Sequence, residues 1–252
     1  MPTHRTAIVT GAGSPRGIGR AIGLALAADG WHVGVLDIDE AAAKDAAHQI
    51  GEGHGVQTLG VRCDVSDAGS VDSAVAEVER GLPPVGAVVN NAGITSPTPF
   101  LQVTPEEFHQ VFAVNVTGTH LVTQRAAGGL VDRGFGRVVN LSSVSAERGG
   151  GVFGGTPYSA AKAAVLGFSR ALARELGPHG VTVNAVAPGL IDTDITQGKL
   201  SPERKEQMVA DTPMRRTGSP QDVAALVAFL CREEAGYITG ATYDVNGGSH
   251  IH

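Results

Sequence analysis

Short apolar runs and longer Ala-rich stretches alternate along most of this chain. The short runs are rich in β-branched residues and read as continuous apolar segments, which is typical of strands that are covered on both faces. We predict about seven strands, at residues 6–9, 32–36, 56–63, 87–89, 137–141, 181–186 and 241–245.

The longer stretches have the length and composition of helices. Ser219-Pro220 opens the last of them, and Gly177-Pro178 follows the fifth, as expected for helix start and stop signals. A shorter helix is expected around residues 202–209. We predict the main helices at residues 20–29, 40–51, 68–81, 105–133, 158–176 and 219–233.

The order of these elements predicts the fold. Strands that alternate with helices and lack hairpin turns indicate right-handed βαβ units and a parallel sheet. The chain shows no linker, repeat or low-complexity segment, so we expect one α/β domain over residues 1–252, a doubly wound parallel sheet with helices on both faces. The polar segment 190–218 is irregular and lies near the strand ends, where we expect a substrate lid.

Composition excludes several classes of function. The net charge of −6 argues against nonspecific binding of nucleic acid, and no apolar run approaches the roughly 20 residues of a membrane span. Neither the two cysteines, Cys63 and Cys231, nor the spacing of the nine histidines suggests a metal site. The first residues show no signal-peptide pattern, so we expect a soluble, cytoplasmic protein.

A glycine-rich stretch, TGAGSPRGIGRA at residues 10–21, joins the first predicted strand to the first predicted helix. Glycines at such a turn let the backbone approach a pyrophosphate, whose charge rests on the helix N-terminus. Taken alone, Gly11, Gly17 and Gly19 are equally consistent with a tight turn. Asp37 strengthens the phosphate interpretation, because it ends the second strand, where a carboxylate can accept hydrogen bonds from the adenosine ribose.

The same two regions bear on the choice of cofactor. A carboxylate at Asp37 repels the 2′-phosphate of NADP, whereas Arg16 could pair with that phosphate. Residues 38–40 supply no second cation. We therefore expect NAD as the cofactor, with NADP as the alternative.

Tyr158 and Lys162 form the candidate catalytic pair. They are four residues apart, so on a helix they share a face. A nearby ammonium and the positive nicotinamide ring would lower the phenol pKa from its usual value of about 10. The tyrosine could then take a hydroxyl proton during hydride transfer, or return it in the reverse direction. An exposed Tyr–Lys pair without a chemical role is the alternative interpretation of this spacing alone.

Together these motifs resemble the short-chain dehydrogenase/reductase family over residues 5–248. The family's TGxxxGxG motif matches at both ends, although Pro15 and Arg16 lengthen the loop here. Asp64-Val65, NNAG at residues 90–93 and PGLIDT at residues 188–193 follow in the family's order. The resemblance implies a Rossmann-type fold. It also implies cofactor contacts from Gly11, Arg16, Gly17, Ile18, Gly19, Asp37, Asp64, Val65, Asn91, Ala92, Gly93, Tyr158, Lys162, Pro188, Gly189, Ile191 and Thr193.

The resemblance completes the catalytic set. Ser143 matches the family's serine at the end of the fifth strand, with Ser145 as the alternative. Its spacing to Tyr158 is longer than the family's, so we place an insertion in the loop at residues 149–156. Asn115 matches the asparagine that kinks the fourth helix and holds a water joined to the lysine. Without the resemblance, the alternative is that an asparagine inside a helix slightly lowers helix stability and makes a local hydrogen bond.

These features predict an oxidoreductase for a secondary alcohol or its ketone, with a polyol, sugar, small alcohol or 3-hydroxyacyl substrate. The alternatives are an NADPH-dependent 3-oxoacyl-(acyl-carrier-protein) reductase and a non-catalytic NAD-binding regulator. The resemblance also implies a homotetramer through the helices at residues 105–133 and 158–176. For two pairs of charged residues the sequence allows two roles each. Glu147 and Arg148 line the substrate pocket or form a solvated loop. Asp192 and Asp194 face the substrate or solvate the lid.

Overall fold

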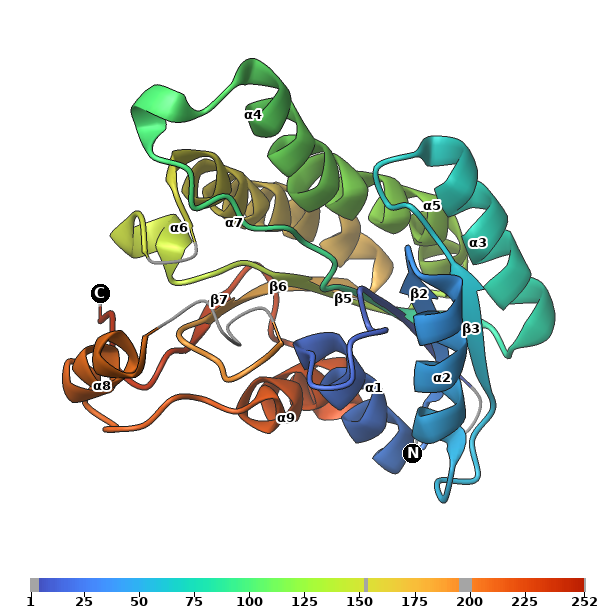
Figure 1. The fold of residues 1–252 in the computed structure, drawn as a ribbon. Helices are drawn as coiled ribbons and strands as arrows, with labels where there is room; N and C mark the ends of the chain where they lie inside the picture. The colour runs from blue at the N-terminus through green and yellow to red at the C-terminus, as the bar shows by residue number, and fades with distance from the viewer. Residues whose placement is uncertain (1–4, 152–153, 195–200, 252) are drawn as a thin grey trace.

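A parallel sheet runs through the centre of the molecule (Figure 1). The computed structural model describes residues 5–151, 154–194 and 201–251. The strands are β1 (Thr6–Thr10), β2 (His32–Asp37), β3 (Thr58–Arg62), β4 (Val85–Asn90), β5 (Gly136–Leu141), β6 (Val181–Pro188) and β7 (Thr242–Val245). They form one seven-stranded sheet in the order β3-β2-β1-β4-β5-β6-β7, with every pairing parallel. This confirms the predicted doubly wound α/β fold.

Helices connect most of the successive strands. The α-helices are α1 (Ile18–Ala28), α2 (Glu40–Gly51), α3 (Ala68–Gly81), α4 (Pro105–Phe112), α5 (Gly118–Asp132), α6 (Ser145–Arg148), α7 (Thr156–Leu176), α8 (Pro202–Ala210) and α9 (Pro220–Cys231). Short 3₁₀ turns are η1 (Phe100–Gln102), η3 (Gly177–His179) and η4 (Glu233–Ala235), and η2 (Ala113–Thr117) is a π-helical turn. None of the helices within these described ranges is long and apolar enough to cross a membrane.

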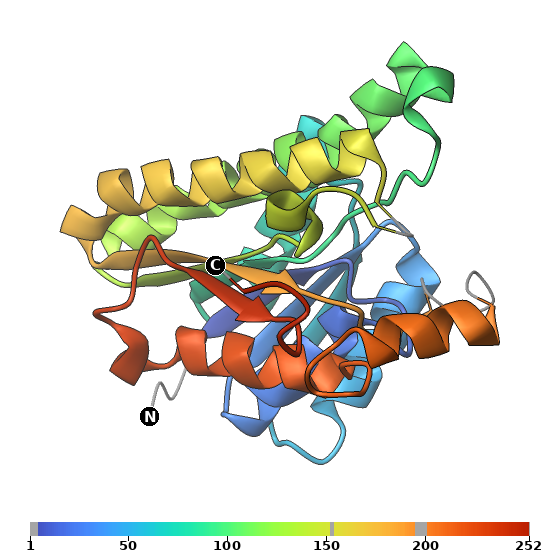
Figure 2. The same cartoon turned by 90° about the vertical axis from the view of Figure 1, so that its left-hand side faces the viewer.

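The helices form a layer on each face of the sheet (Figures 1 and 2). On one face, α1, α2 and α9 pack through a core that includes Ile22, Ile50 and Trp31. On the other face, α3, α5 and α7 pack through a second core that includes Val75 and Val122. Both faces of the strands are therefore buried, which explains their continuous apolar composition.

The direction of winding changes between β1 and β4. β2 and β3 lie on one side of β1, whereas β4 to β7 lie on the other. The connections that follow β1 and β4 lead to helices on opposite faces of the sheet and leave a crevice at the carboxyl ends of the strands, the usual ligand site in open α/β sheets. Gly11 follows β1 there, Asn91 follows β4 and Ser142 follows β5.

Three details differ from the sequence prediction or extend it. The single helix predicted at residues 105–133 is divided into α4 and α5 by η2, where Asn115 donates a hydrogen bond to the Val111 carbonyl. The four-residue helix α6 was not predicted, because it is too short to produce a periodic pattern. α8 confirms the short helix expected within the lid segment, whose residues 195–200 lie outside the described residues.

Candidate active site

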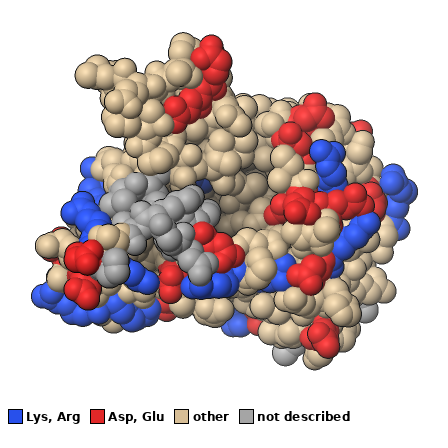
Figure 3. Space-filling view, viewed as in Figure 1, with Lys and Arg blue, Asp and Glu red and all other residues tan. Residues whose placement is uncertain are grey.

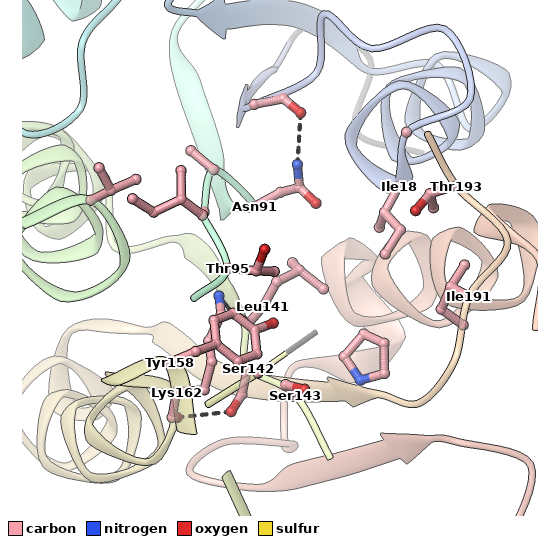
Figure 4. Close-up of a pocket in the computed structure, with 18 of the residues that line it drawn as sticks. Ile18, Asn91, Thr95, Leu141, Ser142, Ser143, Tyr158, Lys162, Ile191 and Thr193 are labelled. Carbon is pink, nitrogen blue, oxygen red and sulfur yellow. Dashed lines mark hydrogen bonds between the residues drawn. The ribbon is translucent and has the colours of Figure 1, made fainter. Parts of the chain in front are cut away.

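A cavity of about 430 Å³ lies at the carboxyl ends of the strands. Figure 3 shows this face of the molecule hollowed below the projecting α4 region. In Figure 4, Tyr158, Lys162, Ser142 and Ser143 gather at one end of the cavity, and Ile18, Asn91, Ile191 and Thr193 lie toward the other. The predicted residues that line it are Gly11, Gly17, Ile18, Asp37, Asp64, Val65, Asn91, Ala92, Gly93, Ser143, Tyr158, Lys162, Pro188, Gly189, Ile191 and Thr193.

The glycine loop forms the wall at one end of this cavity. Gly11 has a φ of +64°, and a Cβ on it would lie 2.7 Å from the Cα of Ala92, so only glycine fits. Gly17 precedes α1 and has no side-chain capping bond, which leaves the first turn of the helix bare. Bare backbone N–H groups beside a cavity fit the diphosphate of a dinucleotide.

Asp37 is fixed against the same loop. One carboxylate oxygen accepts a hydrogen bond from the Gly13 N–H (2.8 Å), and the other accepts one from the Asp39 N–H (3.2 Å). A Cβ on Gly13 would lie 2.8 Å from that carboxylate, so this glycine is also required. Gly13 was not among the predicted site residues, although its place within the glycine-rich run would have been a sufficient signal.

Arg16 lies in an ion-pair network rather than in the cavity wall. Its guanidinium is 3.4 Å from a carboxylate oxygen of Asp192, and its backbone N–H donates to Asp194. The Ser14 hydroxyl donates to the same Asp194 oxygen over 2.6 Å, which is the main reason that the pKa of Asp194 is lowered. The two acidic residues therefore hold the lengthened glycine loop, a role that neither sequence-based interpretation proposed.

The NNAG segment ties β4 to the glycine loop. The Asn91 side-chain amide donates to the carbonyls of Thr10 and Gly11, at 2.9 and 2.8 Å. The Thr10 hydroxyl accepts from the backbone N–H groups of Asn91 and Ala92. Like Arg16, Gly19 does not line the cavity. The Asn91 amide and the Gly11 carbonyl occupy the space that a side chain on Gly19 would need. This end of the site is thus a rigid backbone surface.

Tyr158 and Lys162 lie one turn apart on α7, at the other end of the cavity. The Lys162 ammonium is 5.8 Å from the centre of the Tyr158 ring and donates a 2.7 Å hydrogen bond to the Leu141 carbonyl at the end of β5. The Ser142 hydroxyl donates to the Lys162 carbonyl over 2.9 Å. Ser142 thus fixes α7 to β5, a role for which the sequence carries no separate signal.

Burial shifts the pKa values of both groups. It lowers the pKa of Lys162 to about 8. It raises the pKa of Tyr158, and a hydrogen bond with Ser143 acts in the opposite direction. The sequence-based expectation of a lowered tyrosine pKa is therefore not met by the polypeptide alone. The reason is that loss of solvent around the phenol outweighs its favourable contacts.

Asn115 lies behind Gly93 and is completely buried in the π-helical turn η2. Its amide nitrogen donates to the carbonyls of Ile94 (3.0 Å) and Val111 (2.9 Å), while its oxygen has no hydrogen-bond partner among the residues that the structure describes. A Cβ on Gly93 would lie 2.6 Å from that oxygen and 3.3 Å from the Lys162 ammonium. Asn115 is therefore separated from Lys162 by little more than the width of a glycine, and its free acceptor suits a proton-relay role.

The structure distinguishes the two candidate serines. Ser143 lines the cavity and hydrogen-bonds to Tyr158, and its hydroxyl accepts the backbone N–H of Ser145 (3.1 Å). Ser145 also lines the cavity but begins α6. Ser143 is thus the serine that hydrogen-bonds to the tyrosine. No group of three or more potential metal ligands occurs among the described residues.

Comparisons with known proteins agree with this geometry. Residues 11–250 match a family model described as enoyl-(acyl carrier protein) reductase. The chain is 44% identical to an uncharacterized short-chain type dehydrogenase/reductase of Sinorhizobium fredii, over 98% of both chains. It is 42% identical to a 3-oxoacyl-(acyl-carrier-protein) reductase of Aquifex aeolicus, over 97% of this chain and 96% of that one. It is also 42% identical to a (3R)-3-hydroxyacyl-CoA dehydrogenase of Rattus norvegicus, over 96% and 95%.

Proposed function

Because the chain belongs to the short-chain dehydrogenase/reductase family and is an NAD(P)-dependent oxidoreductase for a CH–OH group, we propose roles for three of its residues. Ser143, Tyr158 and Lys162 catalyse hydride transfer between NAD and a secondary alcohol or its ketone. One observation carries the proposal: these three residues meet at one end of a cavity whose other end is the bare glycine loop. A bound nicotinamide cofactor would reach from one end to the other.

When bound, the cofactor accepts or supplies the hydride. Gly11, Gly17 and Ile18 would hold its diphosphate, and Asp37 its adenosine ribose. The cavity wall formed by Asp64 and Val65 lies beside this region and would cover the adenine. The segment from Pro188 to Thr193 lines the opposite wall and would hold the nicotinamide carboxamide.

Tyr158 is the proposed acid–base group. In alcohol oxidation, its phenolate takes the hydroxyl proton as the hydride leaves the carbon, and in ketone reduction its phenol returns that proton. The Ser143 hydroxyl holds the same substrate oxygen. The Lys162 ammonium stabilises the phenolate by its positive charge, which offsets the rise in pKa caused by burial. Asn115 would hold a water that passes the proton onward from Lys162.

We propose NAD rather than NADP as the preferred cofactor. The Asp37 carboxylate is fixed at the position of the adenosine ribose, where it would repel a 2′-phosphate. Arg16 is already paired with Asp192, so its charge is partly compensated. Lys205 also lies near Asp192, at 3.7 Å.

The substrate class follows from the relatives. The names of two of them, a 3-oxoacyl-(acyl-carrier-protein) reductase and a (3R)-3-hydroxyacyl-CoA dehydrogenase, favour a 3-hydroxyacyl or 3-oxoacyl substrate over a sugar or polyol. An NADPH-dependent 3-oxoacyl reductase remains the second candidate, supported by the first of these names. Asp37 argues against it for the reason given above.

Initial rates test both parts of the proposal. NAD⁺ and NADP⁺ are compared with secondary alcohols, diols, polyols, sugars and 3-hydroxyacyl thioesters as substrates. We expect turnover with NAD⁺ and a 3-hydroxyacyl compound, and a kcat/KM for NADP⁺ that is at least about tenfold lower. Preference for NADP⁺ would favour the second candidate, and no turnover with any alcohol would favour a non-catalytic regulator.

We also propose a homotetramer formed through the helices α4, α5 and α7, and a lid role for the segment 190–218. The projecting α4 region carries exposed apolar side chains, with Phe100 70% and Leu101 95% exposed, which would be covered in an assembly. Light scattering coupled to gel filtration measures the mass directly, and a monomer would exclude the tetramer.

A further inference from the structure

The charged residues that line the cavity are not evenly distributed. Asp37, Asp64 and Asp194 belong to the walls assigned to the cofactor, and Lys162 lies beneath the tyrosine. Arg148 is the remaining charged residue of the lining in the described part of the chain. It therefore supplies a positive charge to the part of the cavity that the cofactor leaves for the substrate.

Arg148 is held in place by the loop that lengthens the spacing between Ser143 and Tyr158. It ends α6 and is followed by three glycines, Gly149, Gly150 and Gly151, all with positive φ. The Gly150 N–H donates to the Ser159 hydroxyl on α7 over 3.0 Å. This bond ties Gly150 to the catalytic helix one residue beyond Tyr158, so this part of the loop lies against the helix that carries the tyrosine.

A series of close approaches connects Arg148 with the catalytic tyrosine. A Cβ on Gly151 would lie 3.9 Å from the Arg148 guanidinium and 3.5 Å from the Ser145 hydroxyl. A Cβ on Gly154 would lie 3.3 Å from the same hydroxyl and 2.5 Å from the Tyr158 ring. The Ser145 hydroxyl thus lies near both the Tyr158 ring and the Arg148 guanidinium, and all three residues line the same cavity. A substrate whose hydroxyl lies at Tyr158 can extend past Ser145 toward Arg148.

The neighbouring acid does not neutralise Arg148. Glu147 lies 3.8 Å from His250, near the C-terminus, and this is the ion pair that the structure shows for it. Within the described ranges, Arg148 takes part in no ion pair with an Asp or Glu. Its guanidinium is exposed at the cavity and keeps its donors for a ligand.

We propose that Arg148 binds an anionic group of the substrate, so that the preferred substrate carries a negative charge away from its hydroxyl carbon. This inference rests on the proposed function of the site. The fork of guanidinium donors matches a carboxylate or a phosphate in two parallel hydrogen bonds. The anion is either the carboxylate of a free 3-hydroxy acid or a phosphate of an acyl thioester.

Substitution of Arg148 distinguishes these sources. Kinetic constants of Arg148→Gln and Arg148→Lys are measured with 3-hydroxybutyrate, its neutral methyl ester and 3-hydroxybutyryl-CoA. We expect Arg148→Gln to raise KM for the charged substrate about 10-fold to 100-fold with a smaller change in kcat, to leave the methyl ester unchanged, and to be partly rescued by lysine. An effect on the free acid identifies the carboxylate, and an effect on the CoA ester alone identifies the phosphate. Equal effects on charged and neutral substrates, or no effect, overturn the proposal.

Two controls keep this result separate from the proposed function. Arg174→Gln removes the same charge from an exposed position on α7 outside the cavity lining, and we expect it to change none of the constants. Calorimetric binding of acetoacetate and acetoacetyl-CoA in the presence of NAD⁺ reports on Arg148 without turnover, because ketone and cofactor are then both oxidised and no hydride can be transferred. Binding that Arg148→Gln weakens in a protein without dehydrogenase activity would support the anion site while rejecting the catalytic proposal. Binding of neither compound by the wild-type protein would overturn the anion site.

Discussion

At the cofactor end of the cavity the surface is made of backbone, whereas at the catalytic end it is made of side chains. Gly11 and Gly17 line the cavity with backbone, and Asn91 and Asp37 hold the loop by hydrogen bonds to the Gly11 carbonyl and the Gly13 N–H. At the other end, Tyr158 and Lys162 project from one helix and are positioned by contacts with β5. In the proposed function, the first surface binds the diphosphate of the cofactor, and the second acts on one oxygen atom of the substrate.

This difference predicts different failures. A change in the backbone surface should weaken cofactor binding and stability together, because the same close contacts pack β1 against β4. A change among the side chains should reduce turnover while the cofactor still binds, because those groups act on the substrate oxygen. Variants at each end can therefore show whether the two ends are as separate as the geometry indicates.

The largest effect is expected from Tyr158→Phe. This change removes the proposed acid–base hydroxyl and leaves the ring that packs against Gly154. We expect kcat to fall about 10³-fold, within the range for the loss of a general acid or base. The affinity for NADH, measured by fluorescence titration, should change less than about twofold. Residual activity above one tenth of wild type would mean that another group transfers the proton.

Glycine substitutions compare the two ends directly. Gly93→Ala places a methyl group 2.6 Å from the Asn115 oxygen and 3.3 Å from the Lys162 ammonium, and we expect kcat to fall about 10-fold to 100-fold with cofactor affinity retained. Gly11→Ala meets the Cα of Ala92 at 2.7 Å from a left-handed backbone position, so we expect lower stability and weaker NADH binding together. Thermal unfolding and NADH titration of both variants make the comparison.

Gly128→Ala is the control for this pair. Gly128 lies in α5, and beyond its own helix no described residue has an atom within 4 Å of the position that its Cβ would occupy. We expect this variant to keep full activity and to gain up to about 1 kcal/mol of stability from the better helix propensity of alanine. Equal loss of NADH affinity in Gly93→Ala and Gly11→Ala would instead show that the two ends form one unit.

Most residues that the sequence predicted for the cofactor end line the cavity. Buried parallel strands produce continuous apolar runs, and the backbone conformation near a phosphate demands glycine, so both leave marks in the residue order. Arg16 and Gly19 do not line the cavity, and the partners of Arg16, Asp192 and Asp194, are remote in sequence. No local pattern reveals an ion pair between two loops that meet only after the sheet has formed.

At the catalytic end, the sequence identified side chains but not their surroundings. The spacing of Tyr158 and Lys162 was sufficient to place them on one face of α7. The π-helical turn at Asn115 and the bond from Ser142 to the Lys162 carbonyl depend on tertiary packing and were not predicted from local patterns. The rise in the tyrosine pKa in the polypeptide alone was not foreseen, because burial cannot be read from residue order, and the lowering expected beside the positive nicotinamide ring stays a prediction.

A smaller effect is expected at the boundary between cofactor recognition and catalysis. Asp37→Asn removes the negative charge but keeps an acceptor for the Gly13 N–H. We expect the ratio of kcat/KM for NADP⁺ to that for NAD⁺ to rise about tenfold, because the repulsion of the 2′-phosphate is relieved. Arg16→Gln should change the ratio less than about twofold, since Asp192 already holds that side chain. A large fall in NADP⁺ use by Arg16→Gln would show that Arg16 leaves Asp192 to bind the phosphate.

The smallest effect concerns the stability of the catalytic end. The pKa of Lys162 is about 8 in the folded protein and 10.5 without burial, so between these values the unfolded chain binds more protons than the folded one. The free energy of unfolding contributed by Lys162 therefore rises with pH across this window and is lost as the pH falls toward 8. Relative to Lys162→Met, the wild-type protein should gain about 2 kcal/mol between pH 8 and about pH 9.5, measured by urea unfolding. The upper limit stays below the usual pKa of tyrosine, so Tyr158 does not contribute.

Lys44→Met is the matched control, because Lys44 is exposed and its partner Glu40 raises its pKa. The difference in free energy of unfolding between Lys44→Met and the wild-type protein should therefore stay constant in this window. A flat difference for Lys162→Met as well would mean that water reaches the ammonium and that the lysine is not held in the dry environment from which its proposed role is argued.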